Sequence, residues 1–121
     1  MKARMFVILA ILCFCPADLL SDDEFMDRML RSSVLKSNLT LMSTHITRFH
    51  PQGLSGVAIL GESHAAIHSW PENGQLFIDI ASCSSKESAY SVFKLIVDHF
   101  PGAQIATYRE LIVVHDCSEN H

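Results

Sequence analysis

The same four-residue pattern, Ser-x-x-Glu, occurs twice in the chain, as "SDDE" at 21–24 and as "SSKE" at 84–87. In such a capping box the serine hydroxyl accepts a hydrogen bond from the amide three residues later, and the glutamate side chain reaches back to the serine amide. Each pattern therefore predicts the start of a helix. We expect one helix at 22–37 and a second that runs to about residue 99, where Pro101 follows.

The segments outside these two helices are rich in β-branched and apolar residues. They are separated by turn signals, with Pro51 and Gly53 in one turn and the pair Asn73 and Gly74 in another. The order is therefore β-α-β-β-β-β-α-β, which predicts an α+β fold, a two-layer α/β sandwich with a mostly antiparallel sheet and two helices on one face. The expected strands are 5–15, 39–49, 54–60, 64–70, 75–82 and 103–115.

Length and charge limit the classes of protein that this chain can belong to. The 121 residues are 49% hydrophobic, which is enough for one core, so we expect a single domain over 1–121. The formal net charge is −4 and no long cluster of Lys or Arg occurs, so nucleic acid is not an expected partner.

The N-terminal run "MFVILAILCFC" follows Lys2 and Arg4, which is how a secretory signal begins. Its length is too short for a membrane span, which needs about 20 apolar residues, but it fits either a signal or one buried strand. The local pattern leaves these two alternatives open, and no membrane partner is expected. The four cysteines show neither a C-x-x-C pair nor zinc-ligand spacing, so we interpret them as reduced thiols, which are typical of the cytoplasm.

The segment "LGESHAAIHSWPE" at 60–72 places several polar residues in a run that otherwise indicates a buried strand. His64 and His68 are four residues apart, which on a strand is about 13 Å, so one metal ion cannot bind both. Ser63 lacks the G-x-S-x-G context of a hydrolase nucleophile. Taken alone, His64 is best interpreted as structural and Cys83 as a small buried apolar residue.

Two longer motifs carry a resemblance to a known family. They are "FHPQGLSGVAILGESHAAIHSWPE" at 49–72 and "DIASC" at 79–83, and together they combine E-S-H, I-H-x-W-P-E and a cysteine twenty residues after the serine. Over nearly its whole length the chain resembles the bacterial S-adenosylmethionine decarboxylase proenzymes, which cut themselves and carry a pyruvoyl group.

The resemblance implies a reaction and a cofactor made from the chain itself. Cleavage between Glu62 and Ser63 would give a beta chain, 1–62, and an alpha chain, 63–121, and would convert Ser63 into a pyruvoyl group. That covalent cofactor forms a Schiff base with the substrate and replaces pyridoxal phosphate, and no metal is required. The expected function is decarboxylation of S-adenosyl-L-methionine to S-adenosyl 3-(methylthio)propylamine for spermidine biosynthesis.

The resemblance also implies roles for five further residues. Ser55 and His68 would assist the self-cleavage, and Cys83 would protonate the substrate carbon after carbon dioxide leaves. Phe49 would stack on the adenine ring and Glu72 would bind the ribose hydroxyls, because a carboxylate accepts from two hydroxyl donors and an aromatic face suits a purine. From the sequence alone, Phe49 could equally be a core residue.

Strand geometry adds a constraint on how these residues meet. In an extended strand, Ser63 and His68 lie about 16 Å apart on opposite faces, so they cannot meet within one strand. The family's bacterial branch implies a homodimer with shared active sites. Ser63 and Cys83 would come from one protomer, and the other would contribute Phe49, Ser55, His68 and Glu72.

Two departures from the family pattern leave alternatives open. The first strand ends in "ILCFC" without the family's acidic residue or the glycine before the cysteine, and Ser84 replaces the glycine after Cys83. Both bear on the pocket, so a pyruvoyl decarboxylase of ornithine or arginine is one alternative. A non-enzymatic relative or a small secreted binding domain is the other. The chain matches the family pattern from its start, so removal of the N-terminal run as a signal would delete a core strand. The run is therefore expected to be a strand and the protein to be cytoplasmic.

Overall fold

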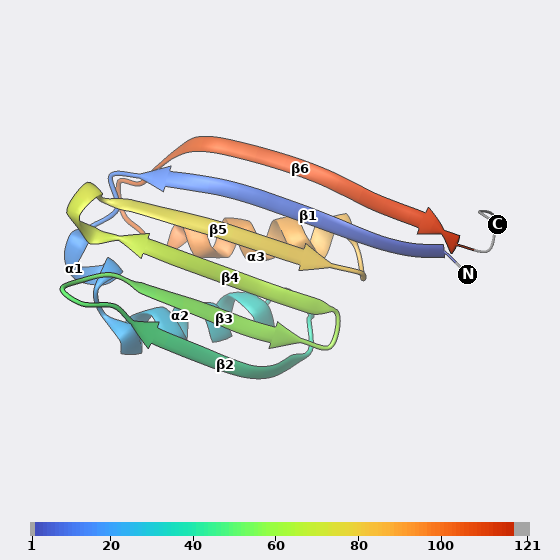
Figure 1. The fold of residues 1–121 in the computed structure, drawn as a ribbon, viewed down its shortest axis with the longest axis horizontal. Coiled ribbons are helices and arrows are strands. Elements are labelled where there is room, and N and C mark those ends of the chain that lie inside the picture. Colours follow the sequence, from blue (N-terminus) through green and yellow to red (C-terminus); the bar gives the residue numbers. More distant parts are fainter. Residues whose placement is uncertain (1, 118–121) are drawn as a thin grey trace.

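The structure is a computed structural model that describes residues 2–117. Its strands form one six-stranded sheet with the order β2-β3-β4-β5-β1-β6. Each neighbouring pair is antiparallel, and the helices all lie on one face (Figure 1). The elements are β1 Lys2–Cys13, α1 Ala17–Leu20, α2 Asp23–Leu35, β2 Leu41–Arg48, β3 Leu54–Leu60, β4 Ser63–Trp70, the 3-10 turn η1 Pro71–Asn73, β5 Gln75–Ser82, α3 Lys86–Asp98 and β6 Gln104–Asp116. The predicted α+β sandwich and its order are confirmed, with α1 and η1 as short additions.

Both long helices begin one residue later than the capping boxes predict. The carboxylate of Asp22, not the hydroxyl of Ser21, accepts the first-turn hydrogen bond of α2, because Ser21 ends the preceding short helix α1. Ser85, not Ser84, caps α3 by accepting from the Ser88 amide at 3.0 Å. The serine patterns therefore located the helices correctly but named the wrong cap residue in each case.

The core lies between the helices and the sheet face that they cover. Alternate residues of each central strand point to this face, as the pleat requires, and the apolar residues of α2 and α3 close over them. Each fully buried large apolar side chain stabilises the fold by about 1.5–3 kcal/mol. The largest of these include Leu12, Met26, Leu30, Ile67, Ile78, Ile80, Phe93 and Ile96.

The N-terminal apolar run is a core strand. β1 pairs with β5 on one side and with β6 on the other, and its residues Ile8, Ala10 and Leu12 are buried against the helices. This confirms the strand alternative for the run. In the part of the chain that the structure describes, no helix is long and apolar enough to cross a membrane.

The opposite face of the sheet has no helix on it and faces the viewer in Figure 1. We call it the open face. In β1 it is lined by alternate apolar residues that are half-buried, and in β4 and β5 it carries His64, His68, Phe77 and Asp79. Of the expected site residues, His68 therefore lies on this uncovered surface.

Candidate active site

The expected site residues lie in two groups at opposite ends of the sheet. Ser63 begins β4, where it pairs with Leu60 of β3 and Ser82 of β5, so it lies beside Cys83. Phe49 follows the far end of β2, and Glu72 lies in η1 after the far end of β4 (Figure 1). The structure thus brings Ser63 and Cys83 together and separates them from Phe49 and Glu72 within one chain.

The tight turn between β3 and β4 is held in place by Thr40. The Gly61 amide donates to the Thr40 carbonyl at 2.9 Å, while the Thr40 amide and hydroxyl donate to the two carboxylate oxygens of Glu62, each at 3.0 Å. The Thr40 amide is the main reason that the pKa of Glu62 is lowered from its ordinary value. These contacts fix the residue before Ser63 in its charged form.

The peptide bond between Glu62 and Ser63 is polarised and sits at an unusual backbone conformation. The Glu62 carbonyl oxygen accepts a hydrogen bond from the Cys83 amide at 3.0 Å. Ser63 has φ +145°, which L-residues rarely adopt and which is characteristic of strained functional sites. Both features concentrate on the one bond that the expected self-cleavage would break.

The Ser63 side chain is the first member of a chain of three polar groups. Its Oγ lies 3.3 Å from Nδ1 of His64, and Nε2 of His64 lies 3.3 Å from Oδ1 of Asp79. From the sequence, His64 had no expected chemical role, and Asp79 had none beyond its place in the motif at 79–83. An aspartate inside the apolar strand "LFIDIAS" was the available signal, but its partner depends on the pairing of β4 with β5.

His68 and Ser55 form a pair in the other group. They are register partners on β4 and β3, and Ser55 Oγ lies 2.5 Å from His68 Nδ1. The His68 ring stacks on Phe77, with 5.8 Å between ring centroids. Ser63 lies five positions from His68 along β4, a separation of about 16 Å, as expected from the sequence.

Phe49 and Glu72 are exposed and lie at the same end of the sheet, because the end of β2 pairs with the start of β3, which pairs with the end of β4. Their loops meet at Gly53, where an added Cβ would come within 2.9 Å of the Ser69 carbonyl oxygen and 3.6 Å of the Pro71 ring. Gly53 also has φ +93° and its carbonyl accepts from the Phe49 amide at 2.8 Å. The glycine therefore allows the β2–β3 loop to pack against η1. Phe49 is 49% exposed, so it is not a core residue of the protomer.

Cys83 is exposed, which corrects the interpretation of this residue as a buried apolar one. Cys15 by contrast is buried, and burial, reinforced by the neighbouring Cys13, raises its pKa to about 11. Cys83 is thus an accessible thiol next to Ser63, as a proton donor must be.

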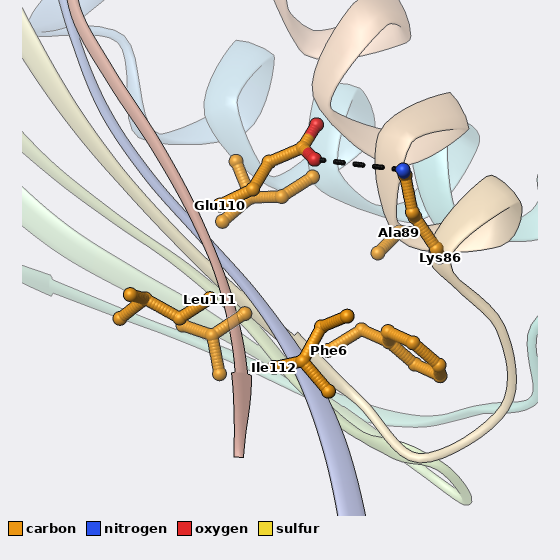
Figure 2. Close-up of a pocket in the computed structure, with 8 residues that line it drawn as sticks. Phe6, Lys86, Ala89, Glu110, Leu111 and Ile112 are labelled. Atoms are coloured by element: carbon orange, nitrogen blue, oxygen red, sulfur yellow. Dashed lines mark ion pairs between the residues drawn. The ribbon is translucent and has the colours of Figure 1, made fainter.

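One pocket lies away from these groups of expected site residues. A small apolar pocket lies between α3 and the β1–β6 pair, and Lys86 and Glu110 form an ion pair of 3.9 Å at its edge (Figure 2). None of the expected site residues lines it. Between residues 2 and 117, no group of three or more His, Cys, Asp or Glu side chains could hold a metal ion.

Comparison with known proteins gives one consistent match. The family model described as S-adenosylmethionine decarboxylase matches residues 8–111. The S-adenosylmethionine decarboxylase proenzyme of Pelotomaculum thermopropionicum is 33% identical over 104 residues, which are 86% of this chain and 82% of that protein. The proenzyme of Aquifex aeolicus is 38% identical over 90 residues, which are 74% and 67% of the two chains. The crystal structure of the Aquifex aeolicus adenosylmethionine decarboxylase matches with a TM-score of 0.79 and 30% identity, and covers 93% of this chain and 91% of that one.

Proposed function

The chain belongs to the S-adenosylmethionine decarboxylase family, and we propose that it cuts itself between Glu62 and Ser63 to make a pyruvoyl group from Ser63. It is an S-adenosylmethionine decarboxylase made as a proenzyme. The observation that carries the proposed cleavage is the hydrogen bond from the Cys83 amide to the Glu62 carbonyl, because this is the carbonyl that Ser63 must attack.

The first step of the cleavage is an acyl shift from nitrogen to oxygen. The Ser63 hydroxyl attacks the Glu62 carbonyl carbon, the peptide C–N bond breaks and an ester remains. Negative charge develops on the carbonyl oxygen, where the Cys83 amide stabilises it, and loss of one such donor typically costs about 10²–10³ in rate. The unusual φ of Ser63 raises the energy of the uncut bond by about 1–3 kcal/mol, which favours the same step.

The second step is elimination from the ester, and it needs a base at the α-carbon of Ser63. His68 would take this proton, and the Ser55 hydroxyl bonded to His68 would hold the ester. The Glu62 carboxylate then leaves as the new end of 1–62. The dehydroalanine that remains is hydrolysed with loss of ammonia, which leaves the pyruvoyl group at the start of 63–121.

The pyruvoyl group, once made, supplies the electron sink that accepts the electrons left by carbon dioxide. The chain's own residues then bind the substrate and deliver a proton. The Cys83 thiol is accessible beside position 63 and would protonate the substrate carbon. The exposed ring of Phe49 suits adenine and the exposed carboxylate of Glu72 suits the ribose hydroxyls. These two side chains favour S-adenosylmethionine over ornithine or arginine, which contain neither an adenine ring nor a ribose.

We propose that the working enzyme is a homodimer with two shared sites. Ser63 and Cys83 lie at one end of the sheet, whereas Ser55, His68, Phe49 and Glu72 lie at or toward the other. A two-fold axis that packs two open faces against each other would bring opposite ends of the two copies together. The half-buried apolar residues of β1 on this face suit such burial. They are Met5, Val7, Leu9 and Ile11.

We further propose a cytoplasmic location. β1 pairs on both sides, so its removal as a signal would delete a strand from within the sheet.

The departures of this chain from the family pattern lie near the end of β1 and after β5. Phe14, at the position of the family's glycine, has φ +62° and is 69% exposed, and it is not part of the bond that is cut.

The experiment that tests this function is release of labelled carbon dioxide by the purified, processed protein. S-adenosylmethionine, ornithine and arginine are supplied separately, with the Ser63→Ala protein as the blank. Release from S-adenosylmethionine alone is the expected result. Release from ornithine or arginine instead would contradict the substrate assignment and keep the self-cleavage.

A further inference from the structure

We propose that His64 is the general base that activates Ser63 for self-cleavage, and that Asp79 positions its ring. This inference rests on the proposed self-cleavage and assigns the proton transfer in its first step. It is carried by the chain of contacts from Ser63 Oγ through His64 to Asp79, with 3.3 Å at each link.

The sheet itself places these three groups. His64 and Asp79 lie on neighbouring strands β4 and β5, where Ala66 is the direct partner of Asp79, so His64 is its diagonal neighbour on the open face. Their side chains are 35% and 34% exposed, so neither is fully solvated. Ser63 lies next to His64 at the start of β4. The relay is therefore held by strand pairing and not by a flexible loop.

The chemistry of the acyl shift requires a base at this position. A serine hydroxyl is a weak nucleophile until a neighbouring group takes its proton. Within the protomer the other candidate bases are engaged or distant, because the Glu62 carboxylate accepts from Thr40 and His68 lies about 16 Å along the same strand. In the proposed dimer the His68 that reaches Ser63 comes from the other copy, and it serves the later elimination. With its proton on Nε2, His64 donates to Asp79 and leaves the Nδ1 lone pair facing the Ser63 hydroxyl.

The step balances without an external reactant. The Ser63 Oγ proton moves to His64 Nδ1 as the Oγ–C bond to Glu62 forms. When the C–N bond breaks, the Ser63 nitrogen takes that proton from the imidazolium. His64 returns to its neutral form, and the later elimination remains with His68, which acts on a different atom of Ser63.

The test is the rate at which freshly made proenzyme disappears, followed on denaturing gels. His64→Asn keeps a polar side chain but removes the base, and we expect a loss of about 10²–10⁴ in rate, the usual contribution of general base catalysis. Added imidazole should restore part of the rate in this variant. His45→Asn is the matched control, because His45 is an exposed histidine on β2 and should leave the rate unchanged.

Asp79 acts through His64, so its test is the coupling between the two. Asp79→Asn should slow the cleavage less than His64→Asn does, and Asp79→Glu should restore part of the rate. In the His64→Asn background, Asp79→Asn should add little, because residues that act as a unit are not additive. Full additivity would overturn the positioning role.

The uncut protein distinguishes a catalytic role of His64 from a role in sheet stability alone. We compare the melting temperature of the Ser63→Ala protein with that of the Ser63→Ala, His64→Asn double variant. Neither protein can cut itself, so any difference reports on the stability of the fold. Similar melting temperatures with slow, imidazole-rescued cleavage support the proposal. A lowered melting temperature without rescue, or cleavage of folded His64→Asn at the wild-type rate, overturns it. A wild-type protein that never cuts would instead overturn the proposed self-cleavage.

Discussion

The backbone amide of Cys83 donates a hydrogen bond of 3.0 Å to the carbonyl oxygen of Glu62. The residue expected to protonate the substrate therefore also touches, through its main chain, the bond expected to be cut. Its two tasks use different atoms, since the amide serves the cleavage and the thiol serves the decarboxylation. A side-chain substitution can separate them.

Cys83→Ala should process at close to the wild-type rate, because alanine retains the backbone amide. The processed variant should then turn over poorly, or inactivate through misplaced protonation, since its proton donor is gone. Gel analysis measures the first effect, and carbon dioxide release measures the second. Full steady-state activity in this variant would remove Cys83 from the reaction.

Thr40→Val should slow the self-cleavage by about threefold, because it removes one of two charge-assisted hydrogen bonds to an exposed carboxylate and leaves the Thr40 amide in place. Thr40→Ser retains the hydroxyl and is the matched control, with a rate near that of the wild type. The measurement is the half-time of the proenzyme band. Equal rates for the valine and serine variants would show that the hydroxyl does not position the turn.

The Glu62 clamp should make stability depend on pH in acid. The folded turn lowers the pKa of Glu62 below its ordinary value of 4.5, so the carboxylate stabilises the fold fully above that value, and the contribution is lost as the pH falls through the lowered pKa. In the uncut Ser63→Ala protein, Glu62→Gln should lower the melting temperature at pH 7, and the difference should narrow as the pH falls below 4.5. A gap between the two proteins that is unchanged at pH 3 would contradict this linkage.

His68→Ala should halt the cleavage after the acyl shift. Without a base at the Ser63 α-carbon the ester accumulates, and hydroxylamine should cleave it into two pieces, because it attacks esters faster than amides. Ser63→Ala forms no ester and should resist the same treatment. If His68→Ala processes at the wild-type rate without hydroxylamine, His68 has no part in the elimination.

Mixed dimers test whether the two ends of the sheet meet in trans. Cys83→Ala and Glu72→Ala homodimers should both be weak, since every site lacks one group. In a mixed dimer one site contains both intact groups and the other contains both substitutions. Co-expression should therefore raise the activity of each mixed dimer toward about half that of the wild-type dimer. Only the average of the two parents, in dimers shown to exchange, would refute the shared site.

Much of the fold could be predicted because its signals are local. The two serine patterns located both long helices, and the runs of β-branched and apolar residues between turn signals located the strands. The short helix α1 and the turn η1 were missed, since four and three residues are too few to show a period. The cap of α2 was displaced by one residue because Ser21 closes α1, which the sequence did not reveal.

Only those parts of the site that are contained in short motifs could be predicted from the sequence. The motifs named Ser63, His68 and Cys83, and strand spacing alone separated the first two. The contacts of His64 with Asp79 and of Glu62 with Thr40 depend on which strands are neighbours. Strand order and register are set by the whole sheet, so no short motif contains them.

The most direct measurement of the central claim is the intact mass of the purified, folded chain under denaturing conditions. The wild type should appear as two species, 1–62 with a free carboxylate at Glu62, and 63–121 with a pyruvoyl group in place of Ser63 and no free α-amine. Ser63→Ala should give one species of full length. A folded wild type that also remains at full length would contradict self-cleavage and, with it, the assignment of Ser63 as the source of the cofactor.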